Sequence, residues 1–97
     1  MVERIVWAPI AVAQKEHIYA YWNKRNKSSR YSQKIESTLD EIFSLLLKNP
    51  SLGKLSIYRN TRVITLGHFQ VFYRVSNTEI QILSFWDSRR DPSKLEI

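Results

Sequence analysis

The chain has 97 residues, which fits a single domain, and its 43% hydrophobic content with only two Gly and three Pro excludes a disordered polypeptide. The absence of Cys excludes disulfides and thiolate metal sites, and no segment reaches the roughly 18 apolar residues that a membrane span needs. A formal net charge of +6 favours an anionic partner, namely nucleic acid, a ribonucleoprotein surface or an acidic protein, although a basic surface that only aids solubility is the alternative.

The first third of the chain predicts a strand followed by a helix. Residues 2–8 contain β-forming side chains, and Pro9 then suits the first turn of a helix over residues 9–26. Ala11, Ile18 and Trp22 share one face of that helix by their spacing. We therefore expect this face to lie on a sheet.

Residues 30–48 have the clearest helical periodicity. The pattern ends at Asn49 and Pro50, which stop a helix. The short break between the two helices predicts an antiparallel hairpin. The apolar stripe that we expect in the core consists of Tyr31, Ile35, Leu39, Ile42, Phe43, Leu46 and Leu47.

Three predicted strands complete the chain after a loop around residues 51–54. They cover residues 59–66, 69–75 and 80–86, with turns short enough for hairpins. The last of them is apolar on both faces, which places it inside the sheet. The order β-α-α-β-β-β predicts one α+β domain over residues 1–97, with the helical hairpin on one face of a mainly antiparallel four-stranded sheet. The other face remains incompletely covered and is expected to bind a partner.

Basic residues gather at the tip of the predicted hairpin, with no acidic residue among them. A solvated helix end explains this cluster, and contact with phosphate or an acidic partner is the alternative. The cluster consists of Lys24, Arg25, Lys27, Arg30 and Lys34.

A second cluster comes from the three last strands and their ends. Basic residues interleaved with aromatic rings suit RNA, because guanidinium planes and rings both stack on bases. Cleavage of RNA without a metal would need a general base, a general acid and cations near the phosphorane. The candidate target-facing surface consists of Arg62, Tyr73, Arg74, Arg89 and Arg90, with Lys54 and His68 nearby.

The charged turn after the last strand allows a structural alternative. Arg89 or Arg90 can pair with Asp87 or Asp91 and clamp the turn instead of forming a site. We expect no cofactor and no metal, because the two His residues lack a supporting acidic cluster.

Several motifs in order resemble the RelE/ParE toxin superfamily of bacterial type II toxin–antitoxin systems, and together they span nearly the whole chain. They are V-W-x-P at 6–9, Y-W-N at 21–23 with Y-S-x-K-I at 31–35, K-N-P-S-L-G at 48–53, the strand pair at 62–75, and the closing strand with its R-x-x-P end at 82–92. The resemblance implies a toxin that is neutralised by a cognate acidic antitoxin. Independently, the lack of a membrane span and of a long apolar N-terminal stretch leads us to expect a cytoplasmic protein.

The superfamily divides by target, and the sequence leaves both targets open. ParE-like members inhibit DNA gyrase, whereas RelE-like members cut mRNA on the ribosome with Lys, Arg and a terminal His or Tyr. Thr65 stands where the nucleases commonly have Arg, and no His or Tyr follows Pro92. Enzymatic activity therefore stays undecided. A non-toxic basic module that binds RNA or the ribosome is the alternative from another class.

Overall fold

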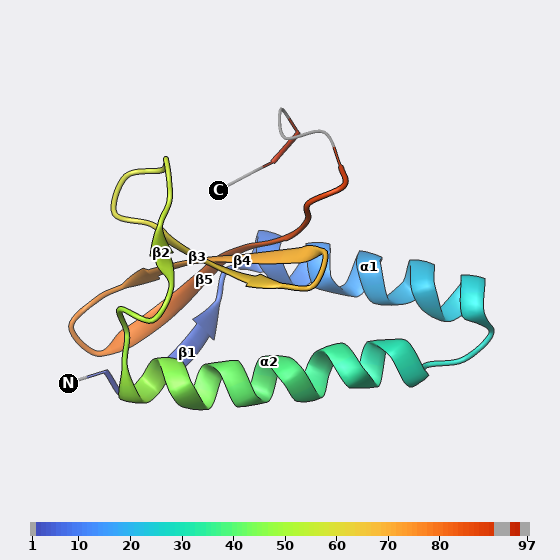
Figure 1. Cartoon of the computed structure of the whole chain (residues 1–97), viewed down its shortest axis with the longest axis horizontal. Coiled ribbons are helices and arrows are strands. Elements are labelled where there is room, and N and C mark those ends of the chain that lie inside the picture. The colour runs from blue at the N-terminus through green and yellow to red at the C-terminus, as the bar shows by residue number, and fades with distance from the viewer. Residues whose placement is uncertain (1, 91–93, 96–97) are drawn as a thin grey trace.

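Two helices and five strands follow one another in residues 2–90 and 94–95, the part of the chain that the computed structural model describes (Figure 1). They are β1 (Arg4–Trp7), α1 (Pro9–Asn26), α2 (Arg30–Lys48), β2 (Lys54–Leu55), β3 (Arg62–Leu66), β4 (Phe69–Val75) and β5 (Glu79–Asp87). The predicted order and the α+β class are confirmed. No helix in these described ranges is both long enough and apolar enough to cross a membrane.

The strands form one sheet in the order β1-β5-β4-β3-β2. Only β1 is parallel to its neighbour; the other pairs are antiparallel. The sheet therefore has five strands rather than the predicted four. The additional strand is β2, which has two residues and lies where the sequence predicts a loop. Two residues are too few for an alternating pattern, so only pairing with β3 defines this strand.

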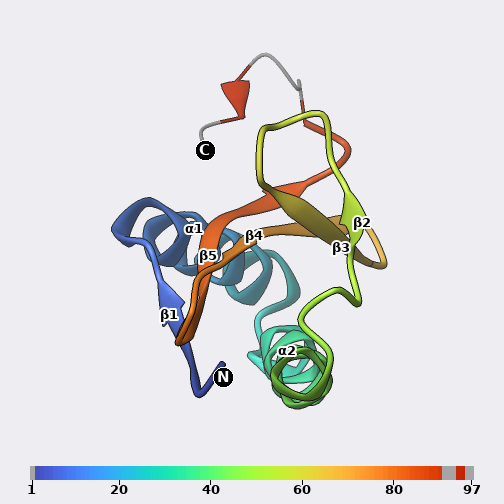
Figure 2. The same ribbon diagram turned by 90° about the vertical axis from the view of Figure 1, so that its left-hand side faces the viewer.

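Both helices lie on the same side of the sheet, α1 beside β5 and α2 beneath it (Figures 1 and 2). This arrangement puts the predicted apolar stripes into one core, in which Leu39 and Leu46 are almost completely buried. Trp22, Tyr31, Ile42 and Phe43 pack around this core with part of their surface exposed. The core itself consists of Ala11, Ile18, Ile35, Leu39, Leu46, Phe69, Val71, Tyr73, Ile80, Ile82 and Phe85.

An irregularity in β5 explains why this strand reads as apolar on both faces. Phe72 pairs with Ser84 and Tyr73 pairs with Ile82, so Leu83 has no partner in β4. Such a bulge shifts the alternation of side chains by one residue. As a result, Ile82 and Phe85 both belong to the core although an odd number of positions separates them. The strand lies inside the sheet, as predicted.

A loop covers part of the second face of the sheet. Residues 56–61 close on themselves through a hydrogen bond from the Ser56 amide to the Thr61 carbonyl oxygen, 3.0 Å. Tyr58 in this loop packs edge-on against Phe72, with ring centroids 5.7 Å apart. Asn60 adopts a left-handed φ of 55° in this turn. β3 therefore begins at Arg62, whereas the sequence predicts a strand that begins at residue 59.

Candidate functional site

The structure divides the predicted target-facing residues between two pockets. Arg74 lies five residues after Phe69 along β4, and Phe69 pairs with Asp87 at the other end of the strand pair. Five strand residues span about 17 Å. The first pocket, here the sheet-edge pocket, is lined by Leu55, Asn60, Arg62, Tyr73, Arg74 and Val75. The second, here the terminal pocket, is lined by His17, Ile18, Tyr21, Trp22, Arg25, Asp87, Arg89 and Arg90.

Tyr73 lies beneath the surface of the sheet-edge pocket, and its side chain is fully buried. Its hydroxyl accepts a hydrogen bond from the Gly53 amide at 2.8 Å and donates one to the Pro50 carbonyl oxygen at 2.9 Å. Burial raises the pKa of this hydroxyl. Tyr73 therefore braces the loop that precedes β2, a contact that its place in the strand pattern does not predict.

The two arginines of the sheet-edge pocket differ in their freedom. Arg62 donates a hydrogen bond from Nη1 to the Gly53 carbonyl oxygen at 2.8 Å, so it supports the same loop as Tyr73. Arg74 is exposed, and its side chain makes no hydrogen bond or ion pair within residues 2–90 and 94–95. Arg74 is thus the cation of this pocket that can reach a partner.

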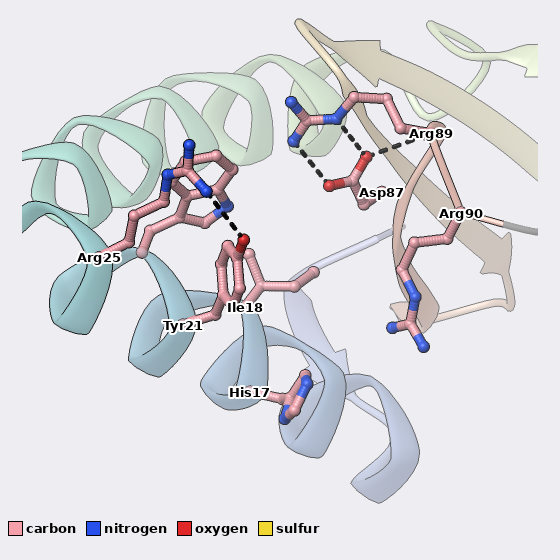
Figure 3. A pocket seen from close by; sticks show the side chains of 8 residues that line it. His17, Ile18, Tyr21, Arg25, Asp87, Arg89 and Arg90 are labelled. Carbon is pink, nitrogen blue, oxygen red and sulfur yellow. Dashed lines mark hydrogen bonds and ion pairs between the residues drawn. The ribbon is translucent and has the colours of Figure 1, made fainter.

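The terminal pocket contains the charged turn in which the sequence predicts either a clamp or a site. Arg89 holds Asp87 side-on, with 2.9 Å between Nε and Oδ1 and 2.7 Å between Nη2 and Oδ2 (Figure 3). The Arg89 amide donates a third bond to Oδ1 at 3.0 Å. This pairing lowers the pKa of Asp87 and raises that of Arg89. Asp91 and Pro92, the other residues of the predicted turn, lie outside the described residues.

Aromatic rings from α1 form the opposite wall of the terminal pocket. The guanidinium of Arg89 lies 5.4 Å from the ring of Trp22, and that of Arg25 lies 5.6 Å from the same ring. Arg25 also donates a hydrogen bond to the Tyr21 hydroxyl at 3.3 Å (Figure 3). Residues that are more than sixty positions apart thus form one arginine–aromatic cluster.

Arg90 extends this cluster toward the second face of the sheet. Its guanidinium lies 4.9 Å from the ring of Trp86, a buried residue of β5. The pocket has a volume of about 570 Å³, within the size range of small-molecule sites. The sequence did not predict the contribution of α1, although Tyr21 and Arg25 share one helix face at a spacing of four residues.

The other basic residues lie outside both pockets. Lys24, Lys27, Arg30 and Lys34 are exposed around the connection between the helices, as expected for a solvated tip. His68 is exposed in the turn between β3 and β4, and Thr65 and Lys54 are exposed on their strands. Among the described residues, no three His, Cys, Asp or Glu side chains gather as metal ligands.

The chain matches a protein-family model, and its fold is similar to that of a solved structure. Residues 5–92 match the sequence model of a family described as the ParE toxin of the type II toxin–antitoxin system parDE. A solved structure titled "Chromosomal ParDE TA system from P. aeruginosa" is similar in fold, with a TM-score of 0.73 and 22% sequence identity over 88% of this chain and 94% of that chain. The curated proteins contain no match.

Proposed function

The chain belongs to the ParE toxin family of type II toxin–antitoxin systems, and from this premise we propose that it inhibits growth by binding DNA gyrase and that a cognate acidic antitoxin neutralises it. The match to a family described as the ParE toxin of parDE supports the general role of a toxin that an antitoxin neutralises. The choice of gyrase over ribosome-bound mRNA rests on the arrangement of the arginines.

The separation of the two pockets is the observation that carries this choice. Cleavage of RNA without a metal requires an acid, a base and cations within hydrogen-bonding reach of one phosphodiester. Arg74 and Arg89 lie near opposite ends of the β4–β5 pair. Tyr73 already uses its hydroxyl as both donor and acceptor within the protein. Such an arrangement suits a toxin that binds its target more than one that cuts RNA.

We assign target contact to the exposed arginines of the predicted surface, which are Arg74, Arg89 and Arg90. Their exposure supports this assignment. Arg62 and Tyr73 act as positioning residues, because both hold the loop at Gly53. The predicted surface is thereby reduced to its three accessible cations.

An acidic antitoxin segment fits the same charges. The net charge of +6 attracts an anionic chain over distances of about a Debye length. Rim charges of this kind mainly accelerate association, so the affinity of the complex is expected to fall as salt is added. The antitoxin and the target then compete for overlapping arginines.

The experiment that tests the function compares two targets with one protein preparation. Purified toxin is added to a DNA gyrase supercoiling assay and to a translating ribosome system in which mRNA integrity is followed. We expect inhibition of supercoiling with intact mRNA, and recovery of supercoiling when the cognate acidic antitoxin is added. Cleaved mRNA without inhibition of gyrase would establish the RelE-like activity instead. No effect in either assay would favour a non-toxic RNA- or ribosome-binding module.

A further inference from the structure

The terminal pocket carries more positive charge than its single carboxylate, that of Asp87, can neutralise. Three guanidinium groups, those of Arg25, Arg89 and Arg90, line the pocket together with one carboxylate, that of Asp87. Both oxygens of Asp87 accept bonds from Arg89. Three positive charges against one negative charge leave an excess of two. The pocket therefore attracts anions.

Two of these guanidinium groups are already held in place without a ligand. Arg89 is fixed by Asp87 on one side and by Trp22 on the other. Its two bonds to Asp87 use two of the five N–H donors of a guanidinium, so three remain. Arg25 is fixed by Trp22 and by the Tyr21 hydroxyl. Such preorganisation lowers the entropy that binding costs.

The aromatic wall distinguishes between possible anions. The side chain of Tyr21 is 52% exposed although it stands beside the guanidinium of Arg25 (Figure 3). Exposed aromatic rings next to arginines provide stacking platforms for nucleic-acid bases, whereas a carboxylate needs only the cations. Planar guanidinium groups match the geometry of carboxylate and phosphate oxygens alike, so the exposed ring makes the difference. Ring and cations together therefore favour a nucleotide over an acidic peptide.

We propose that the terminal pocket binds single-stranded nucleic acid, with phosphates contacted by Arg25, Arg89 and Arg90 and a base stacked on Tyr21. The proposal goes beyond the proposed function, because it gives Arg89 and Arg90 a nucleic-acid ligand in addition to the protein target and adds Arg25 and Tyr21 of α1 to the site. DNA and RNA share this chemistry, so the experiment compares them.

The test measures fluorescence anisotropy of short labelled single strands of DNA and RNA with the same base sequence. The pocket variants are Arg25→Gln, Arg90→Gln and Tyr21→Ala, and Tyr21→Phe keeps the ring. The matched control is Arg59→Gln, which removes the same charge from an exposed residue of the loop over the second face. Fluorescently labelled poly-glutamate is measured in the same way, as a ligand that carries charge without bases.

Arg25→Gln, Arg90→Gln and Tyr21→Ala are each expected to weaken binding about tenfold, because each removes a charge-assisted bond or a stacking platform. Tyr21→Phe, which keeps the ring, is expected to weaken binding less. The control is expected to change the affinity less than about twofold. A preference for either strand then identifies the source of the nucleotide. An equal loss in Arg59→Gln would overturn the proposal, because it would show non-specific attraction to a basic protein. Binding of poly-glutamate without binding of either strand would also overturn it and assign the pocket to an acidic peptide.

The test of strand binding and the test of gyrase inhibition can give independent results. Inhibition of supercoiling by a toxin that binds neither strand would reject the nucleotide site and leave the proposed target intact. Pocket-dependent binding without inhibition of supercoiling would support the nucleotide site and reject the proposed target.

Discussion

The hydroxyl oxygen of Tyr73 lies 2.8 Å from the amide nitrogen of Gly53, and a Cβ atom added at Gly53 would lie only 2.7 Å from the same oxygen. This close approach connects β4 to the loop before β2, which carries the K-N-P-S-L-G motif. The loop is thus held by one buried side chain, and two substitutions test how much stability that contact contributes.

Replacing Tyr73 by Phe should destabilise the fold by about 1–3 kcal/mol, since it leaves the Gly53 amide and the Pro50 carbonyl without their buried partner. Chemical denaturation measures this loss. Tyr58→Phe is the matched control, because the Tyr58 hydroxyl makes no hydrogen bond within the described residues. A Tyr73→Phe protein as stable as the control would show that the loop does not depend on the hydroxyl.

Replacing Gly53 by Ala should cost about 1–3 kcal/mol for a different reason, the overpacking of a filled site. The new methyl group would meet the Tyr73 ring at 2.7 Å and the Val63 carbonyl oxygen at 2.9 Å. Combining it with Tyr73→Phe should cost less than the sum of the single effects, because the hydroxyl contact is then already absent. Additive losses in denaturation midpoints would contradict this coupling.

Leu39→Ala and Leu46→Ala should each lower the free energy of unfolding by about 2–5 kcal/mol, because both side chains are almost completely buried. Leu45→Ala on the same helix is the matched control, since its side chain is 53% exposed. The control should lose less than about 1 kcal/mol. Equal losses at positions 45 and 46 would mean that another face of α2 packs on the sheet.

The sequence was sufficient to predict the helices, because these follow from periodicity over many residues, and the interior position of β5, because its apolar residues fall on both faces. It was insufficient for β2 and for the bulge at Leu83, which depend on the pairing of strands distant in sequence. In the candidate site, too, local contacts were predicted and contacts between distant residues were not. The Arg89–Asp87 pair lies within one turn and was foreseen as an alternative. The contact of Arg89 with Trp22 joins residues far apart and was not predicted.

Tyr73 shows that the position of a residue in a strand does not reveal which contacts its side chain makes. Its neighbour Arg74 is exposed, while Tyr73 itself is fully buried against the loop at Gly53. A tyrosine that forms hydrogen bonds with a loop and a tyrosine that faces a target look the same in the sequence. The difference arises from the path of the loop, which no local pattern specifies.

The ion pair between Asp87 and Arg89 predicts how stability depends on pH. Because Arg89 holds the pKa of Asp87 below its ordinary value, the pair stabilises the folded state fully above the unfolded pKa of about 3.9 and loses this contribution as the pH falls below it. The contribution should be at most about 1 kcal/mol, since the Arg89 side chain is 44% exposed.

Asp87→Asn should therefore be less stable than the original protein near neutral pH, and the difference should shrink in acid. Denaturant titrations across the acidic range measure it, with the exposed Asp40→Asn as the control. A difference of the same size at neutral and acidic pH would show that the charge of Asp87 does not stabilise the fold.

Substitutions of the two arginines of the sheet-edge pocket should show that stability depends on one of them and toxicity on the other. Arg62→Ala should lower stability by about 1 kcal/mol, because it removes the bond to the Gly53 carbonyl oxygen. Arg74→Ala removes an exposed side chain without such a bond, so its melting temperature should stay unchanged while its growth inhibition falls. Both variants are compared by induced expression and by thermal melting of the purified protein.

The same paired measurement decides whether the exposed arginines contact the target at all. Replacing Arg74, Arg89 and Arg90 together by Ala should weaken target binding by well over about tenfold, since arginines are frequent hot spots of interfaces. Melting of the triple variant should fall only by the contributions of the Asp87–Arg89 pair and of the arginine contacts with Trp22 and Trp86. Full toxicity of a folded triple variant would refute the assignment and move target contact to the basic tip between the helices, around Lys24 and Lys27.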